Sequence, residues 1–111
     1  MSAAPKPVPK PPAPALREDK TYELADMFKM LGDPSRLRIV IATLEGPVSV
    51  GEIAERLGLS ISLVSHHLRL LRAARLVTAD RRGKQIFYRT HDQHVARVID
   101  DMIAHVNEEA E

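Results

Sequence analysis

The segment SVGEIAERLGLSISLVSHHLRLLRAAR, residues 49–75, decides the fold. Ser49 and Glu52 have the spacing of a capping box, so a short helix is expected to begin there and to end at Gly58. Ser60 can cap the next helix, which continues to about Arg75 and carries an apolar face at helical spacing: Ile61, Val64, Leu68 and Leu71. Because only a short turn separates the two helices, the segment predicts a helix-turn-helix.

Two further helices are expected before this segment. Leu24, Phe28 and Leu31 recur at the spacing of one helical face between residues 20 and 32. Asp33-Pro34 then supplies an N-cap followed by proline at the first position of a helix. This second helix is expected to run to the Gly46-Pro47 pair with an apolar stripe of four residues: Leu37, Val40, Ile41 and Leu44.

The spacing of the apolar residues changes from helical to strand-like after residue 75. Residues 76–80 and 85–89 are strand-like runs on either side of the basic sequence Arg81-Arg82-Gly83-Lys84, which predicts a β-hairpin with a cationic tip. A last helix is expected from about Asp92 to Glu108, with an apolar stripe formed by Val95, Val98, Ile99, Met102, Ile103 and Val106. The predicted architecture is mainly α with a β wing, in the order α-α-α-α-β-β-α: a winged helix-turn-helix over residues 19–109.

Length and composition limit what this chain can be. Its 111 residues suffice for one domain, and residues 1–18 form a proline-rich, extended tail in this interpretation. No apolar run approaches the ~20 residues that span a bilayer, and the N-terminus lacks a signal-peptide core, so we expect a cytoplasmic protein without a membrane partner. The absence of cysteine excludes thiolate metal sites and cysteine nucleophiles.

The charge is distributed unevenly, although the net charge is only +1. Residues 60–90 contain seven basic residues and one acidic residue, a local charge of +6, whereas residues 91–111 contain six acidic residues and one basic residue, a local charge of −5. A solvated face could explain the basic cluster alone. Its position on a helix-turn-helix and a hairpin tip favours binding to double-stranded DNA.

Polar side chains on the second motif helix could read the DNA. Ser60, Ser62, Ser65, His66 and His67 could reach major-groove edges, and Arg81, Arg82 and Lys84 could follow phosphates or a minor groove. For Ser60, a role as N-cap is the simpler explanation. Because adjacent residues point about 100° apart on a helix, we expect one of the two histidines to be structural.

The last helix carries a candidate metal site that needs two chains. His94 and His105 are eleven residues apart, about 20° from alignment on one face, but separated by ~16 Å along the axis, so one chain cannot bring both to one ion. In an antiparallel pair of copies, the register that places His94 opposite His105 also places Asp92 within one residue of Glu108. The pair would contain two sites, each with four ligands suited to tetrahedral zinc.

Each of these four residues also has an ordinary explanation. Asp92 is a good N-cap, Glu108 is a common charge at a helix end, and single histidines are frequent on surfaces.

The chain resembles the ArsR/SmtB family of bacterial metal-sensing repressors between Leu24 and Glu108. The resemblance rests on LGDPSRLR at residues 31–38, LVSHHLRLL at 63–71, and Asp92-x-His94 with His105-x-x-Glu108. It implies a homodimer, formed through the first and last helices, that binds operator DNA without metal and is released when metal fills sites on the last helix. It also implies that Ser62, Ser65 and His66 contact DNA.

The same resemblance indicates which metal binds and how the metal site is linked to the DNA-binding helix. Asp92, His94, His105 and Glu108 match the zinc-sensing pattern, whereas members that sense arsenic, cadmium or lead use cysteines, often where this chain has Val48-Ser49-Val50-Gly51. Zinc is therefore expected, with cobalt as a mimic, while nickel stays open because His91 could complete an octahedral shell. In related zinc sensors, the second histidine donates its distal N–H toward the reading helix, which here would link His105 to the backbone near Arg75.

Two other classes of function are compatible with parts of this pattern. A zinc hydrolase needs an open metal position and a general base, but four ligands would fill the site, so we expect no enzyme and no small-molecule substrate. A DNA-binding regulator without a metal ligand, or one that binds another protein through its proline-rich tail, is the remaining alternative.

Overall fold

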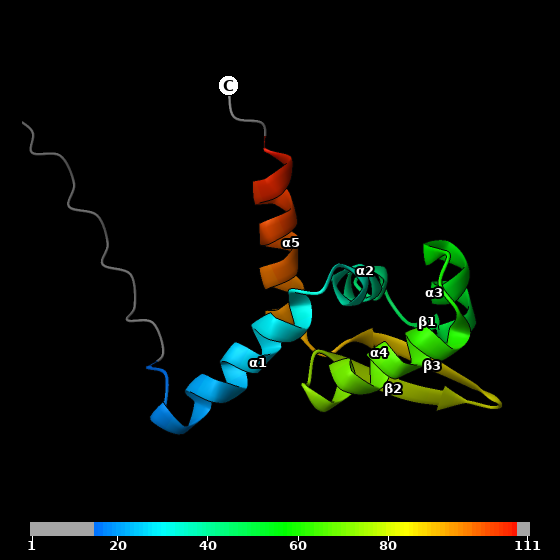
Figure 1. The fold of residues 1–111 in the computed structure, drawn as a ribbon, viewed down its shortest axis with the longest axis horizontal. Coiled ribbons are helices and arrows are strands. Elements are labelled where there is room, and N and C mark those ends of the chain that lie inside the picture. The colour runs from blue at the N-terminus through cyan, green and yellow to red at the C-terminus, as the bar shows by residue number, and fades with distance from the viewer. Residues whose placement is uncertain (1–14, 109–111) are drawn as a thin grey trace, which may run out of the picture.

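The computed structural model describes residues 15–108 and has the predicted winged helix-turn-helix architecture (Figure 1). After a short 3-10 helix, η1 (Glu18–Lys20), the helices are α1 (Thr21–Leu31), α2 (Pro34–Ala42), α3 (Val50–Leu57), α4 (Ile61–Ala73) and α5 (Gln93–Asn107). The strands β1 (Val48–Ser49), β2 (Val77–Arg82) and β3 (Gln85–Thr90) form an antiparallel sheet in the order β1-β3-β2. Strand β1 was not predicted, because two residues give no periodic signal.

Most element boundaries agree with the sequence, and the exceptions have local causes. Helix α4 ends at Ala73 rather than near Arg75, and α5 ends one residue before Glu108. Strand β2 continues through Arg81 and Arg82, so these arginines belong to the strand and not to the hairpin tip. Of the predicted tail, residues 1–14 lie outside the described residues, as do residues 109–111, and Glu18 already belongs to η1.

The predicted N-caps are confirmed. The side chain of Asp33 accepts a hydrogen bond from the backbone N–H of Arg36 at 3.0 Å. Ser49 and Ser60 accept equivalent bonds, from the third residue after each, at 3.2 and 3.1 Å. Such bonds satisfy backbone donors that have no partner within the helix, which is why short polar residues mark these helix starts so clearly.

The core lies where α2, α3, α4 and the base of the sheet meet. Its fully buried aliphatic side chains are Ile39, Val40, Ile53, Val64, Leu68, Leu71, Leu76 and Val77. The predicted stripe of α2 was partly wrong: Ile39 is fully buried, whereas Ile41 is 37% exposed. The buried face of α2 continues instead to Thr43, whose hydroxyl donates to the Val40 carbonyl oxygen at 2.6 Å and lies 2.9 Å from the hydroxyl of Thr90. Ile61, in the first turn of α4, is also exposed.

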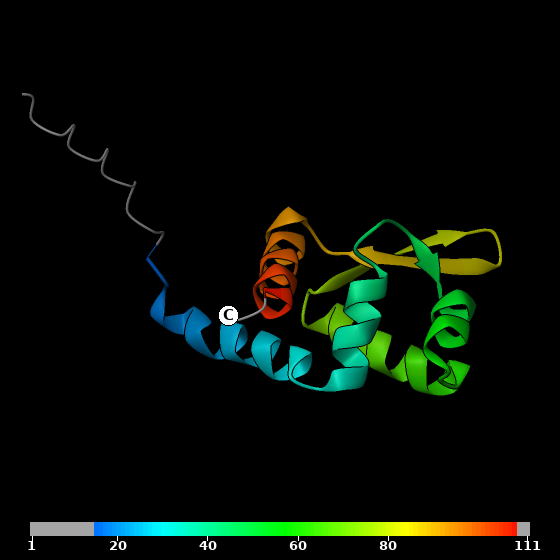
Figure 2. The ribbon, with the colours of Figure 1, turned by 90° about the horizontal axis from the view of Figure 1, so that it is seen from above.

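Helices α1 and α5 lie to one side of this core (Figures 1 and 2). Helix α5 rises from the end of β3 and projects beyond the other elements, and the N-terminal end of α1 extends away from them. The start of α5 is attached to the end of the helix-turn-helix, since the His91 amide donates to the Leu76 carbonyl oxygen at 3.0 Å. No helix within residues 15–108 combines the length and apolar character of a membrane-spanning helix.

Candidate functional site

Helix α4 presents the predicted reading residues on one exposed face. Ser62 and His66 are exposed and Ser65 is half-buried. Gly58, in the left-handed region with φ 68°, ends α3 and allows the tight turn that places α4. Seven residues after Ser62, the exposed Arg69 lies about 20° from it around the helix. Arg69 was predicted only as one of the seven basic residues between 60 and 90, although its spacing from Ser62 places it on the same helical face.

The two adjacent histidines of α4 have different environments. His67 is only 9% exposed, while His66 faces solvent. His67 is therefore the structural histidine, as expected for one of the pair. Its Nδ1 is buried and has no hydrogen-bond partner within the described residues.

The wing places its arginines on opposite faces of the hairpin. A two-residue turn at Gly83 and Lys84, with Gly83 at φ 63°, joins β2 to β3. Because side chains alternate along a strand, Arg81 lies on the face that carries buried Val77, and Arg82 lies on the outer face. The two guanidinium groups therefore leave the wing in different directions.

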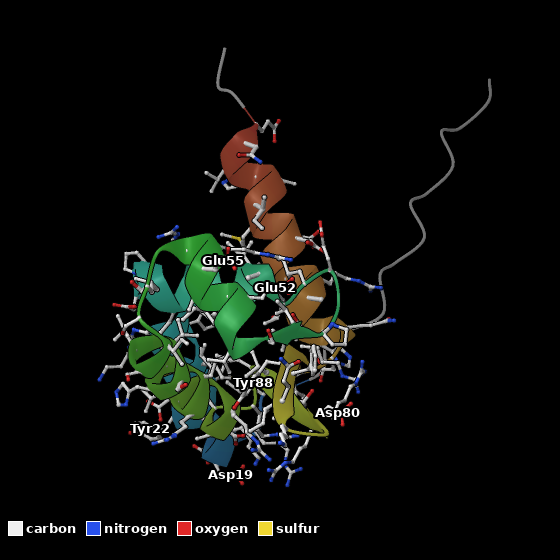
Figure 3. The ribbon with its side chains drawn as sticks, turned by 90° about the vertical axis from the view of Figure 1, so that its right-hand side faces the viewer. Asp19, Tyr22, Glu52, Glu55, Asp80 and Tyr88 are labelled. Carbon is white, nitrogen blue, oxygen red and sulfur yellow. The ribbon has the colours of Figure 1, made fainter. Side chains whose placement is uncertain are left out.

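Arg82 is also engaged within the wing. Its Nε lies 3.2 Å from a carboxylate oxygen of Asp80, and its guanidinium lies 5.3 Å from the centre of the Phe87 ring. Figure 3 shows Asp80 at the outer edge of the wing and Tyr88 in the interior. Arg81 donates from Nε to the Gly83 carbonyl oxygen at 3.3 Å but, unlike Arg82, lies beside no carboxylate within the described residues. Arg81 and Lys84 are therefore the stronger candidates for DNA contacts on the wing.

Two acidic side chains of the helix-turn-helix lie on α3, away from the wing. In Figure 3, Glu52 and Glu55 lie on α3, on the other side of Tyr88 from Asp80 and the wing. DNA would therefore meet α4 and the wing rather than the acidic face of α3.

The first half of the candidate metal site lies at the start of α5. Asp92 is the N-cap, and its Oδ1 accepts a hydrogen bond from the Val95 amide at 3.0 Å. This bond lowers the pKa of Asp92 below its ordinary value of 3.8, and the neighbouring histidines act in the same direction. The Nδ1 of His94 lies 3.7 Å from the same carboxylate oxygen, and the imidazole is 97% exposed. The two side chains thus point into the same solvent region.

The second half lies at the other end of α5. His105 and Glu108 are both exposed. The helix ends at Asn107 and Glu108 is its extended C-cap (φ −71°, ψ 114°), but the Glu108 amide still donates to the Ala104 carbonyl oxygen at 3.1 Å, so Glu108 directly follows the last helical turn. Within residues 15–108, no three His, Asp or Glu side chains are grouped closely enough to hold one ion.

The donor set nevertheless fits a metal ion if two chains contribute. Two imidazoles and two carboxylates are nitrogen and oxygen donors of the type that zinc, cobalt and nickel accept. His91, the possible additional ligand, has a buried Nδ1, which leaves only its Nε2 for a metal.

The predicted link between His105 and Arg75 is not formed within one chain. The C-terminal half of α5 projects away from the turn that follows α4 (Figure 1), whereas the start of α5 is bonded to that turn through Leu76. Such a link would need His105 of a second, antiparallel α5.

Two adjoining apolar grooves follow α5. The first, of about 180 Å³, lies between α1 and the start of α5, and the second, of about 430 Å³, is lined by α1, α2 and the C-terminal half of α5. Large apolar side chains along them are exposed to solvent, with Phe28 59% and Val106 76% exposed. Contiguous apolar surface of this kind marks an interaction site.

Known proteins are similar to this chain in sequence and in fold. The family model described as "Bacterial regulatory protein, arsR family" matches residues 33–79. The HTH-type transcriptional regulator NmtR of Mycobacterium tuberculosis (strain ATCC 25618 / H37Rv) is 41% identical over 96 residues, which cover 86% of this chain and 79% of NmtR. The chain belongs to the ArsR family of bacterial regulatory proteins.

Solved structures of ArsR-type proteins have the same fold. The homodimeric winged helix-turn-helix DNA-binding domain of Mb0332 from Mycobacterium bovis superposes with a TM-score of 0.75 at 26% identity, covering 89% of this chain and 94% of that one. The cadmium metal-sensor CmtR of Mycobacterium tuberculosis superposes with a TM-score of 0.64 at 38% identity, covering 78% and 91%. These ArsR relatives are transcriptional regulators and not enzymes, and metal sensors are among them.

Proposed function

We propose that this ArsR protein is a dimeric repressor that binds operator DNA without metal and releases it when Zn(II) binds between the subunits on α5. The observation that carries the proposal is the placement of His94 and His105 at opposite ends of one exposed face of α5, beside uncovered apolar grooves. Two such faces in antiparallel contact would place His94 of each subunit beside His105 of the other.

The dimer would use α1 and α5. Both grooves along α5 expose apolar side chains that a second copy would cover, including Phe28, Val98 and Met102. Burial of this surface is favourable, at roughly 25 cal/mol for each Å² removed from water. The homodimeric state named for the similar Mb0332 domain supports the same arrangement.

DNA binding would use α4 and the wing of each subunit. Ser62, Ser65 and His66 would contact the bases and backbone of a major groove, with Arg69 on the same face. Arg81 and Lys84 would contact phosphates beside it, with a smaller contribution from Arg82. A two-fold dimer of this kind binds two half-sites, so we expect a palindromic operator.

The metal response would use residues at both ends of α5. Four residues would hold zinc: Asp92 and His94 from one subunit, and His105 and Glu108 from the other. The Asp92 carboxylate can keep its bond to the Val95 amide through Oδ1 and offer its second oxygen. His105 would arrive beside the Leu76 turn of the opposite subunit, where its distal N–H could bond the backbone near Arg75.

Thermodynamic linkage relates the effect of metal on DNA affinity to the effect of DNA on metal affinity. If bound metal lowers the affinity for DNA, bound DNA must lower the affinity for metal by the same factor. Metal contacts that fix the two α5 helices would also fix the turns after α4, and thereby the relative positions of the reading helices.

A cobalt(II) titration of the metal-free protein tests the site without knowledge of the operator. We expect intense visible bands of a tetrahedral complex that saturate near one ion per chain and disappear when zinc is added. The His105→Ala variant should lose these bands, whereas the matched His66→Ala variant should keep them. Weak bands would favour the octahedral nickel or cobalt alternative, and a lack of saturable binding would leave a DNA-binding regulator without a metal ligand.

A further inference from the structure

Helix α4, the reading helix of the proposed function, ends in a turn that would ordinarily contain glycine. The Leu76 amide donates to the Leu71 carbonyl oxygen at 2.9 Å, and the Arg75 amide donates to the Arg72 carbonyl oxygen at 3.0 Å. These two bonds form a Schellman motif, and its apolar partners Leu71 and Leu76 are both buried. Arg75 occupies the left-handed position of the motif with φ 62°, the single non-glycine residue with positive φ within residues 15–108.

The Arg75 side chain reaches from this turn to α1. Its Nη1 lies 3.9 Å from Oε1 of Glu23, and Glu23 also accepts a hydrogen bond from Lys20 at 3.0 Å. The hydrogen bond from Lys20 is the main cause that lowers the pKa of Glu23, and Arg75 adds a smaller effect in the same direction. Glu23 is therefore an anion at neutral pH and can attract the guanidinium.

The facing surfaces of α1 and the C-terminal part of α4 are not fully packed against each other. An open hollow of about 350 Å³ lies between them, lined on α1 by Glu23, Asp26, Lys29 and Met30, and on the other side by Leu70 and Ala73 of α4 and its C-cap Ala74. The small side chains of Ala73 and Ala74 leave this space open. The contact between Arg75 and Glu23 bridges the two helices beside the hollow.

We propose that Arg75 is a positioning residue, which holds the C-terminal end of α4 to α1 through Glu23 and so sets the placement of the two reading helices in the dimer. Helix α1 lines both grooves that a second subunit would cover, so its angle to α4 determines the separation of the reading helices. The inference rests on the DNA-binding part of the proposed function and not on the metal site. It concerns the Arg75 side chain, whereas the link to His105 would use the backbone nearby.

The sign of the effect at Glu23 distinguishes positioning from simple electrostatics. Removal of an acidic charge near DNA should strengthen binding, because the phosphates repel that charge. Glu23→Gln should instead weaken binding by about two- to fivefold, the range expected for an exposed ion pair. Asp26→Asn is the matched control, since it removes the same charge from the same side of the hollow but does not touch the contact with Arg75.

The binding probe is a duplex selected from a random library by the wild-type protein, and affinity is measured by fluorescence anisotropy. Arg75→Ala should also weaken binding, and the double variant with Glu23→Gln should be no weaker than Arg75→Ala alone. If Glu23→Gln strengthens binding as Asp26→Asn does, Glu23 acts only through its charge and the proposal is wrong. Additive losses in the double variant would overturn it as well.

A comparison with Arg75→Gly separates positioning from stability. Both Arg75→Gly and Arg75→Ala remove the guanidinium, but glycine fits the left-handed conformation and should melt several degrees higher. Equal loss of DNA affinity in the two variants, with an unchanged dimer fraction by light scattering, supports the proposal. If DNA affinity instead falls in proportion to the loss of melting temperature, the positioning role of Arg75 is contradicted. A wild-type protein that selects no duplex contradicts the proposed function itself.

Discussion

The amide of His91 and the carbonyl of Leu76 join the two halves of this molecule through a hydrogen bond of 3.0 Å. His91 directly precedes Asp92, the first residue of the candidate metal site, and Leu76 closes the turn that ends the reading helix. The bond extends the pairing of β2 with β3 by one residue beyond Val77 and Thr90. A displacement of Asp92 would therefore be transmitted to α4 through one backbone contact.

Loss of His105 should separate metal response from DNA binding. The residue lies at the end of α5 that projects away from α4 and the wing, so His105→Ala should bind the selected duplex with wild-type affinity (Figure 1). Addition of zinc should release the wild-type protein but not the variant, because one of two imidazole ligands is missing. Anisotropy with and without zinc measures both properties, and wild-type release by the variant would show that His105 is not a ligand.

The two histidines of α4 should respond differently to substitution. His67→Ala leaves a cavity in a buried position and should lower the free energy of unfolding by about 1–3 kcal/mol. His66→Ala alters an exposed side chain and should change the free energy of unfolding by less than about 0.5 kcal/mol, while weakening DNA binding. Urea unfolding and anisotropy test the pair, and a stable His67→Ala variant would argue against a structural role.

The wing residues should contribute unequally to the salt dependence of DNA binding. Arg81→Ala and Lys84→Ala should each reduce the slope of log affinity against log salt by about 1, as expected for the loss of one phosphate contact. Arg82→Ala should reduce it less, because Asp80 and Phe87 already engage this guanidinium. Binding measured at several salt concentrations gives the slopes. A slope change at Arg82 as large as at Arg81 would mean that DNA displaces Asp80.

Asp92 should make the stability of the metal-free protein sensitive to acid. Its pKa is lowered in the folded state, chiefly by the hydrogen bond from the Val95 amide, so the carboxylate stabilises the fold above its ordinary pKa of 3.8. This stabilisation should disappear as the pH falls below 3.8 and through the lowered pKa. Asp92→Asn keeps an oxygen for the N-cap but has no charge to lose. The difference in melting temperature between the two proteins should be constant near neutral pH and narrow below 3.8.

Local signals allowed the sequence to predict the helix starts, because Asp33, Ser49, Ser60 and Asp92 each bond a backbone amide within three residues. Features that depend on distant partners were not predictable in this way. Strand β1 exists through the pairing of Val48 with Tyr88, forty residues later in the chain.

Periodicity identified apolar faces but could not say which neighbour covers each one. In α2, Ile39 packs in the core, whereas Ile41 lines the groove beside α5. For the candidate site, spacing placed His94 and His105 on one face of one helix. The left-handed conformation of Arg75 could not have been predicted, because glycine is the residue that favours it.

The four proposed metal ligands are divided between the two ends of α5, and this division has a consequence for the cell. A solitary subunit holds half of each proposed zinc site, so metal capture and subunit pairing would be linked by mass action. The zinc level at which transcription begins would then depend on how many copies of the protein the cell contains. A bacterium could adjust that threshold through the strength of a promoter, without changing a single ligand.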